Sequence, residues 1–578
     1  MTKRIIIFLK SHGLFLLLIV LSIGLAYKDF PQTFFQQDEW LGFGNNIYYQ
    51  SRGLTGFIES FFPGDPIQHF NPLAIAYSWL TFFVFGINFT PYAWLSILLH
   101  IVNSLLLYYF VSSWFKNKKI AFIAALFFGV NSIPSQAVTW VANTNSYEIP
   151  TALTILSLIF FHKFLKEEKH QKVNIMISFL MILVSFLFHE NTIFIFIFYP
   201  VILLLFTKSE RKKLFPIFSY AIAIFILLFV LIRIPLFFFG FSNPVPPAVN
   251  IDRPPIVVYP YRIISLSMKA FAASLFPQKA LIQISGEVVK LAYPQFIATD
   301  NAPNPYITQS IVFDLVSYLL TIIIVCIAVL FIKFVHDKNI RKAILCSLIF
   351  VPLSVIPYAF VLGKAGYASI FEPKFLYIPS IGVSLFLAVV VYELIVLSKT
   401  SKIKTTFLLL FLGLYMLFHT FQTRAKIDEL QKMGSQIKTF ISTIHSSYPH
   451  LPQNIVFFTR SDTTYYGMPD NEKLLPTEVG FGKILMIRYQ DKEKFPSCFY
   501  ENNYLLYLLA QGYKECDGRG FGYFRDYDKL VAAIKTNNIS TLDVISYSWN
   551  GDTEEFTDIT KQIRNKINAE MLSQYDTK

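Results

Sequence analysis

Long runs of apolar residues dominate the first three quarters of the chain. Runs of about 20 residues, the length that crosses the hydrocarbon core of a bilayer as a helix, recur up to residue 422. The pattern predicts a polytopic α-helical membrane protein with about eleven transmembrane helices. The first run lacks a clear small-residue cleavage site, which favours a retained helix over a signal peptide. The predicted spans are residues 5–26, 91–114, 120–139, 147–165, 172–188, 190–206, 214–238, 310–334, 341–361, 375–397 and 403–422.

Basic residues predict which side of the membrane each linker between the spans occupies. The most basic stretches are the N-terminus with Lys3 and Arg4 and the linkers 116–119, 162–172, 208–213, 333–342 and 398–404. The positive-inside rule assigns all of them to the cytoplasm. The apolar segment 72–86 has about 15 residues, which is short for a span. All the basic stretches lie on one side of the membrane only if this segment lies along the outer interface and does not cross. We therefore expect a plasma-membrane protein with a cytoplasmic N-terminus and an extracytoplasmic C-terminus.

This topology places five polar segments outside the cell, namely residues 27–90, 143–148, 189–191, 239–309 and 363–374. The long loop 239–309 begins with "SNPVPPAVNIDRPP", which is too rich in proline for regular structure. Residues 259–277 of the same loop predict a second helix that lies on the membrane surface.

The character of the chain changes after residue 424. Residues 425–444 have the pattern of a helix, whereas "NIVFFT", "KILMIRY" and "LDVISYSW" have that of strands. We expect a membrane domain over 1–424 and an exported α/β domain over 425–578. The glycine cluster "GRGFGYF" (518–524) is interpreted as a turn. Cys498 and Cys516 lie in this part, and export would permit a disulfide between them.

Composition excludes some classes of function. The chain is 54% hydrophobic and 15% charged, and its mean hydropathy is +0.49. The net charge of +13 comes from short linkers between spans, which does not indicate a nucleic-acid partner. Centres of the spans are almost free of charge, which disfavours an ion-coupled transporter. The main polar insertion, His100 and Asn103 on one helical face, favours an interhelical hydrogen bond.

The polar residues gather instead at the outer face of the membrane. Nucleotide sugars and ATP are not normally supplied there, so a polyprenyl-phosphate carrier in the bilayer would have to deliver an activated group. Transfer to an acceptor hydroxyl needs a carboxylate that takes the acceptor proton. It also needs cations that stabilise the charge on the leaving phosphate.

Five motifs in the predicted outer loops and adjoining spans resemble those of one family of enzymes. They are the acidic pair Asp38–Glu39, the segment 69–109 with its "HxxN" span, "GVNSIPSQAVTWVANTNSYE" (129–148), "FLFHENTIF" (186–194) and "FEPKFLYIPSIG" (371–382). In this order they resemble the GT-C superfamily of polyprenyl-phosphate-dependent glycosyltransferases. Within it, the chain is most similar to protein O-mannosyltransferases of the transmembrane type that carries TPR repeats, although those repeats are absent.

The resemblance implies an inverting glycosyltransferase with Asp38 as general base. Glu39 is the second catalytic candidate, or else caps a helix. The candidates for the donor phosphate and lipid are Lys374, Arg253, Arg262 and His189, and those for acceptor or metal are Glu190, His69 and Glu372. A snorkelling lysine, headgroup-contacting arginines and a polar His189–Glu190 hinge are the corresponding structural alternatives.

Several features depart from the family pattern. Thr144 and His189 stand where relatives often have Arg and Lys, and Lys374 replaces an Arg, so the phosphate site is expected to be arranged differently. The expected partners are a polyprenyl-phosphate-linked sugar, membrane lipids and an acceptor protein, lipid or glycan. A divalent cation, Mg²⁺ or Mn²⁺, is a possible cofactor.

Two other functions remain open at this stage. One is an O-antigen ligase or oligosaccharyltransferase, which would move a preassembled glycan and would make the acidic pair incidental. The other is a transporter or sensor whose exported domain binds a ligand.

Overall fold

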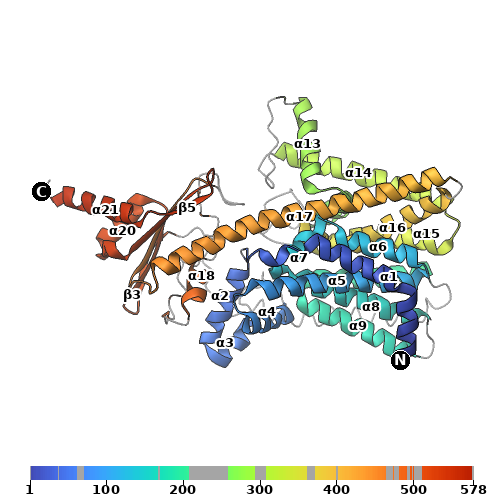
Figure 1. Ribbon diagram of the computed structural model, residues 1–578, viewed down its shortest axis with the longest axis horizontal. Coiled ribbons are helices and arrows are strands. Elements are labelled where there is room, and N and C mark those ends of the chain that lie inside the picture. The colour runs from blue at the N-terminus through green and yellow to red at the C-terminus, as the bar shows by residue number, and fades with distance from the viewer. Residues whose placement is uncertain are drawn as a thin grey trace. The chain divides into compact units, whose positions relative to one another are not determined.

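The computed structural model describes residues 2–36, 38–61, 71–166, 170–206, 258–292, 294, 307–360, 372–398, 401–463, 473, 475, 481–490, 495–496, 499 and 511–575. The chain divides into two compact units (Figure 1). The membrane unit comprises Met1–Gln32, Phe61–Phe241 and Ile251–Glu429. The sheet unit comprises Thr33–Ser60, Ser242–Asn250 and Leu430–Lys578.

Within the described residues, eight helices are long and apolar enough to cross a membrane, and one bent helix pair makes a ninth. The helices concerned are α1 (Thr2–Tyr27), α5 (Phe89–Phe115), α6 (Lys118–Val130), α8 (Ile149–Lys166), α9 (Gln171–Phe188), α14 (Ile307–Phe334), α15 (Lys338–Val355), α16 (Pro379–Leu397) and α17 (Lys402–Ser447). A polytopic helical membrane protein is thereby confirmed. The predicted span 214–238 lies outside the described residues.

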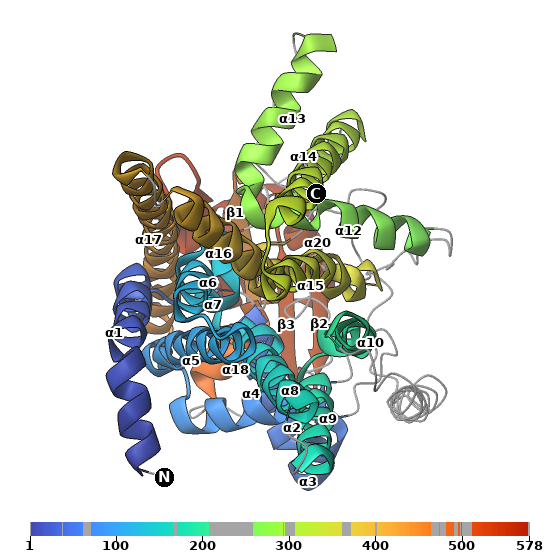
Figure 2. The same cartoon turned by 90° about the vertical axis from the view of Figure 1, so that its right-hand side faces the viewer.

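The helices of the membrane unit pack against sequence neighbours and, in one case, against a distant helix. α8 packs against α9, α15 against α16, and α6 against both α5 and α16 (Figure 2). The bent pair consists of α6 and Ile133–Thr139, which meet at 57°. Asn131 is extended at the bend, and Pro134 has no N–H to continue the helical hydrogen bonds.

Shorter helices accompany the spans. They are α4 (Pro72–Phe85), α7 (Gln136–Thr139), α10 (Ile195–Phe206), α12 (Val258–Leu275) and α13 (Gln278–Ala292). Helix α4 begins at a proline and is followed by Gly86 as its C-cap, whose φ of 55° suits a residue without a Cβ. Both α4 and the predicted span 190–206 form apolar helices shorter than 18 residues. The predicted surface helix 259–277 corresponds to α12.

A mixed five-stranded sheet forms the centre of the sheet unit, in the order β2-β3-β1-β4-β5. The strands are β1 (Ile455–Ser461), β2 (Gly512–Cys516), β3 (Arg519–Phe524), β4 (Val544–Asn550) and β5 (Glu555–Asp558). Strand β1 pairs in parallel with β3 and β4, whereas β2 and β5 add antiparallel edges. Central parallel strands are buried on both faces and so have continuous apolar sequences. The strands predicted at "NIVFFT" and "LDVISYSW" are confirmed.

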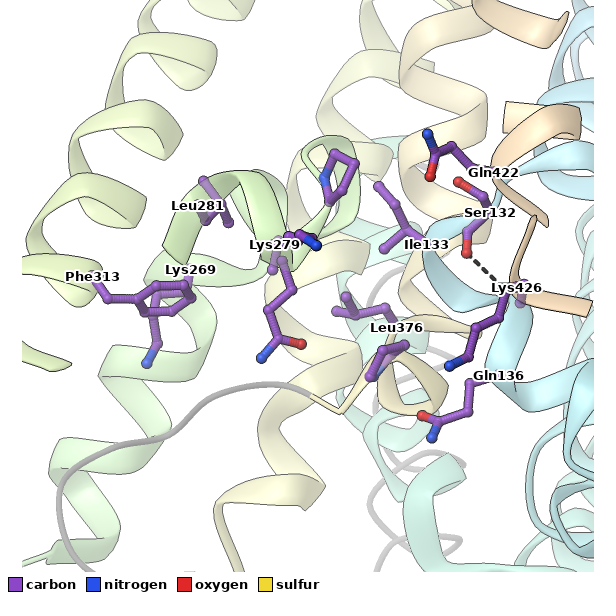
Figure 3. Close-up of a pocket in the computed structure, with 15 residues that line it drawn as sticks. Ser132, Ile133, Gln136, Lys269, Lys279, Leu281, Phe313, Leu376, Gln422 and Lys426 are labelled. Atoms are coloured by element: carbon purple, nitrogen blue, oxygen red, sulfur yellow. Dashed lines mark hydrogen bonds between the residues drawn. The ribbon is translucent and has the colours of Figure 1, made fainter. Parts of the chain in front are cut away.

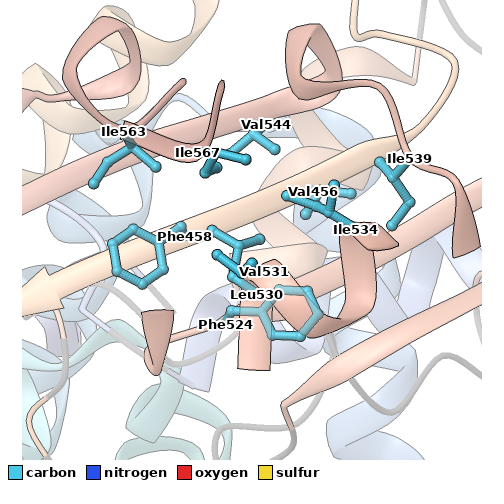
Figure 4. Packing of buried hydrophobic residues seen from close by; sticks show 10 residues of the cluster. All are labelled: Val456, Phe458, Phe524, Leu530, Val531, Ile534, Ile539, Val544, Ile563 and Ile567. Carbon is cyan, nitrogen blue, oxygen red and sulfur yellow. The ribbon is translucent and has the colours of Figure 1, made fainter. Parts of the chain in front are cut away.

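Helices cover both faces of this sheet. On one face, α20 (Tyr527–Asn537) and α21 (Thr560–Tyr575) contribute to a buried cluster (Figure 4). The cluster consists of Val456, Phe458, Phe524, Leu530, Val531, Ile534, Ile539, Val544, Ile563 and Ile567. On the other face, Phe440 of α17 contacts the rings of Tyr547 and Phe556. The central strands β1 and β4 thereby bury alternate side chains on opposite sides.

Two predictions for the C-terminal part are wrong. "KILMIRY" forms α18 (Phe481–Tyr489) and not a strand. Residues 482–487 are all buried, and periodicity does not separate a fully buried helix from a buried strand. The glycine cluster forms β3 and not a turn. The turn lies just before it, where Asp517 and Gly518 both have positive φ, as in a two-residue hairpin.

One helix joins two predicted elements. The predicted span 403–422 and the predicted helix 425–444 are both parts of α17, which is continuous over 46 residues. Cys516 is disulfide-bonded, whereas Cys326 and Cys346 are free. Cys498 lies outside the described residues.

Candidate functional site

The acidic pair begins helix α2 (Asp38–Ser51) in the sheet unit. Asp38 is exposed, whereas Glu39 is buried. The Oε2 atom of Glu39 accepts a hydrogen bond from the backbone N–H of Gln36 at 3.3 Å, the kind of contact that caps a helix start. Carboxylates in a first turn are also favoured by the helix dipole. The two acids therefore differ: Asp38 faces outward and Glu39 fastens the turn.

The "HxxN" motif of α5 lies in a buried hydrogen-bond network of the membrane unit. His100 Nε2 donates to the carbonyl of Gly129 at 2.9 Å, because a carbonyl can only accept. Its Nδ1 then accepts from the Tyr377 hydroxyl at 2.7 Å. Asn103 Nδ2 donates to the Tyr377 oxygen at 3.1 Å and to the Glu148 carbonyl at 3.0 Å. The interhelical bonding predicted for His100 and Asn103 is confirmed.

Glu148 extends this network to the start of α8. Ser96 Oγ lies 2.6 Å from Glu148 Oε2 and 2.8 Å from the carbonyl oxygen of Val138. The Ser96 hydroxyl is the donor in both contacts, so its single proton is shared between the Glu148 carboxyl and the Val138 carbonyl in a three-centre arrangement.

The His189–Glu190 pair forms the turn between α9 and α10. His189 is buried, and its Nδ1 accepts the N–H of Asn191 at 3.2 Å. Its ring lies 5.7 Å from the ring of Tyr147. Asn191 in turn donates to the Ser146 carbonyl at 3.1 Å. These contacts connect the motif "NTNSYE" (143–148) with the motif "FLFHENTIF" (186–194).

Lys374 and Glu372 lie close together at the short helix η8 (Pro373–Leu376). Lys374 Nζ lies 2.8 Å from a Glu372 carboxylate oxygen and 4.4 Å from the centroid of the Trp140 ring. Its backbone N–H donates to Gln136 Oε1 at 3.3 Å. The ammonium is therefore held by a carboxylate and an aromatic face.

The remaining donor-side and acceptor-side candidates are Arg262, His69 and Arg253. Arg262 is buried on α12. His69 and Arg253 lie outside the described residues.

A cavity of about 330 Å³ opens beside η8 in the membrane unit (Figure 3). Three lysines line it, together with amide and apolar side chains. The lining residues are Ser132, Ile133, Ser135, Gln136, Lys269, Ala273, Pro277, Gln278, Lys279, Leu281, Phe313, Pro373, Leu376, Gln422 and Lys426. Gln136 connects the cavity to Lys374 by the hydrogen bond described above. Amines beside apolar walls suit an anion with an apolar tail.

The three lysines have different environments. Lys269 is buried and lies 2.7 Å from Asp314, and burial lowers the pKa of its ammonium against the attraction of that carboxylate. Lys279 is exposed at the start of α13. Lys426 is also exposed and contacts Glu429 at 2.8 Å. Lys279 and Lys426 therefore line the cavity as solvent-accessible cations, and Lys269 lines it as a buried cation beside a counter-ion.

Sequence reasoning missed these lysines. A faint signal existed at Lys269, because it follows Arg262 by seven residues, which places both on one face of a helix. Lys279 and Lys426 come from segments more than a hundred residues apart, and only folding brings them to one cavity.

Metal coordination has limited support from the described residues. Among them, no group of three or more His, Cys, Asp or Glu side chains is arranged to hold an ion.

One protein-family model matches part of the chain. Residues 69–234 match the model of the dolichyl-phosphate-mannose-protein mannosyltransferase family. The predicted resemblance is confirmed. The matched part contains His100, Asn103, Glu148 and the His189–Glu190 turn. No curated protein matches the chain.

Two solved structures are similar to the chain at low identity. One is the archaeal oligosaccharyltransferase AglB from Archaeoglobus fulgidus, in complex with an inhibitory peptide and a dolichol-phosphate (14% identity, TM-score 0.42). The other is the Archaeoglobus fulgidus oligosaccharyltransferase in the apo form (14% identity, TM-score 0.43). Each match covers 78% of this chain and 62% of the solved chain, so the chain spans less than two thirds of either.

Proposed function

We propose that this membrane protein is a glycosyltransferase that moves a sugar from a polyprenyl-phosphate donor to an acceptor hydroxyl at the extracytoplasmic face. The observation that carries the proposal is the lysine-lined cavity beside η8. The family match over residues 69–234 supports the same class of reaction.

The cavity has the chemistry that a polyprenyl phosphate requires. Lys279 and Lys426 supply accessible ammonium groups for the phosphate oxygens, and such charge-assisted hydrogen bonds are stronger than neutral ones. Ile133, Leu281 and Phe313 supply apolar surface for the first isoprene units. Lys269 adds positive charge from the protein side, and Asp314 offsets the cost of burying it.

The proposed reaction is a single displacement. Asp38 takes the proton of the acceptor hydroxyl, whose oxygen attacks the anomeric carbon of the sugar. The bond from that carbon to the phosphate oxygen breaks, and its electron pair leaves with the phosphate. Attack opposite the leaving group inverts the configuration. Phosphate needs no proton to leave, because the lysines stabilise its charge.

The other predicted residues receive supporting roles. We propose that Lys374 contributes to the donor phosphate site from beside the cavity, with Glu372 and Trp140 fixing its ammonium. Arg262 and His189 remain donor-side candidates, and Glu190 remains an acceptor-side candidate. The proposed chemistry includes no metal step. An acceptor protein, lipid or glycan and a plasma-membrane location, with the sheet unit exported, complete the proposal.

The test is lipid binding by the detergent-purified full chain, followed by native mass spectrometry. The probes are undecaprenyl phosphate and undecaprenol, which differ only in the phosphate. We expect the wild type to prefer the phosphate, and Lys279→Ala and Lys426→Ala each to weaken its binding about tenfold, the effect of one lost charged hydrogen bond.

Matched controls lie on the same helices. Lys290→Ala on α13 and Lys404→Ala on α17 remove lysines that do not line the cavity and should leave binding unchanged. Asp38→Asn should still bind the phosphate and accumulate sugar-bearing lipid. Equal binding of phosphate and alcohol, or equal binding by all variants, would overturn the proposed phosphate site.

A further inference from the structure

The segment that carries the acidic pair is packed by residues from the far end of the chain. Residues 33–60 belong to the same compact unit as 430–578. Gly434 of α17 contacts Phe34 so closely that a Cβ at this glycine would lie 2.8 Å from Phe34 Cβ and 2.9 Å from its backbone nitrogen. Backbone atoms do not move aside as a flexible side chain does, so only glycine fits here without a shift of the segment.

A second contact fixes the same segment one helical turn further along α17. Lys438 Nζ lies 5.0 Å from the Phe34 ring centroid, within the range of a cation–π contact. It also donates to the backbone carbonyl of Thr33 at 3.5 Å. Gly434 and Lys438, four residues apart, therefore face the start of this segment together.

The third contact is on helix α2 itself. Helix α18 packs against α2, and a Cβ at Gly44 would lie 2.7 Å from Lys483 Cβ. The stem of Lys483 is buried there. Gly44 thus allows the two helices to approach at a distance that any larger residue would increase.

Local aromatic packing transmits these contacts to the acidic pair. The Phe35 ring lies 5.4 Å from Trp40 and 5.1 Å from Phe43, and all three are buried. Glu39 closes the same turn through Gln36. A displacement at Phe34 would therefore move the first turn of α2 as a piece, including Asp38.

We propose that the C-terminal part of the chain positions the acidic pair, with Gly434, Lys438 and Gly44 as positioning residues that act through Phe34 and α2. The proposal rests on the proposed function for the role of Asp38. It gives the sheet unit a part in the transferase reaction that does not require it to bind the acceptor.

The test compares two glycine-to-alanine changes in one helix. Gly434→Ala meets Phe34, whereas Gly413→Ala on α17 has nothing within 4 Å of the added methyl group. Both changes replace a glycine inside α17 by alanine, a residue with a higher helix propensity. The full chain in detergent is analysed by hydrogen–deuterium exchange, with Gly44→Ala as a second, independent variant.

The contact and its catalytic effect have separate readouts. We expect faster exchange over residues 33–51 in Gly434→Ala and Gly44→Ala, and wild-type exchange there in Gly413→Ala. We also expect release of polyprenyl phosphate from mannosyl polyprenyl phosphate, with water as the acceptor of the mannose, to fall at least tenfold in kcat. Binding of undecaprenyl phosphate should be unchanged, because the cavity residues are intact.

Each result decides one question. Wild-type exchange over 33–51 in Gly434→Ala would overturn the positioning contact, and this measurement needs no substrate. Faster exchange with unchanged turnover would overturn its role in catalysis. If Asp38→Asn turns over like the wild type while the exchange result holds, the proposed base fails and the contact stands.

Discussion

At the scale of single residues, two buried lysines differ in what compensates the burial of their charge. Lys269 is buried beside Asp314 at 2.7 Å, so its charge has a counter-ion. For Lys483 in the sheet unit, burial lowers the pKa to about 8 from an ordinary value of 10.5. Its packing against Gly44 explains the burial, because the stem lies where α2 and α18 meet.

Lys483 makes the first prediction at this scale. Below pH 8 it is charged in both the folded and the unfolded chain, and the folded state then carries the full cost of burial, about 3 kcal/mol for this pKa difference. Stability should rise as the pH increases from 8 to 10.5, where only the folded form loses the proton. Lys483→Met should therefore raise the apparent melting temperature at pH 7 and give a smaller gain at pH 10.

The matched control for this measurement is Lys514→Met, a change at an exposed lysine of β2. It should shift the melting temperature little at either pH. An equal gain for Lys483→Met at both pH values would show that packing, and not the buried charge, accounts for the effect.

At the scale of elements, the network around Tyr377 links helices that lie far apart in sequence. Its hydroxyl donates to His100 and accepts from Asn103, so the segment that contains Tyr377 is fastened to α5. Asn103 also reaches the backbone at Glu148. The network combines three motifs that the family resemblance had selected, which gives those motifs a structural role.

Tyr377→Phe tests this role. The change removes one hydroxyl and leaves His100 Nδ1 and one Asn103 proton without their present partner, at a cost of about 1–2 kcal/mol. We expect the purified chain to unfold at a lower SDS concentration than the wild type. Tyr415→Phe, on a ring that packs against Phe127, should change the midpoint less. Equal shifts for both variants would contradict the network's contribution.

At the scale of the whole molecule, topology rests on the distribution of Lys and Arg. Single cysteines test it when Cys326 and Cys346 are replaced by alanine and the disulfide of Cys516 is retained. A membrane-impermeant maleimide should label Lys529→Cys in intact cells and Lys119→Cys only after lysis, since both positions are exposed. Labelling of Lys119→Cys from outside would reverse the proposed orientation.

Much of the architecture follows from patterns that are local along the chain. Apolar length predicts the spans, because about 20 residues are needed to cross a bilayer. Runs rich in β-branched and aromatic residues predict β1 and β4, because such side chains suit the surface of a sheet. The i, i+3 spacing of His100 and Asn103 predicts that they act on one face of α5, and their shared bond to Tyr377 agrees. In each case the residues that form the element and the sequence pattern that predicts it lie in the same short stretch of the chain.

Other features were decided only by tertiary structure, because they depend on which distant residues meet. Residues 482–487 are all buried, so their sequence suits a helix and a strand equally, and packing against α2 accompanies the helix. The cavity lysines Lys269, Lys279 and Lys426 converge from separate elements. The sequence around Gly434 does not indicate that this glycine makes a close contact. The need for glycine there comes from Phe34, which lies 400 residues away in the chain and contacts Gly434 directly in the fold.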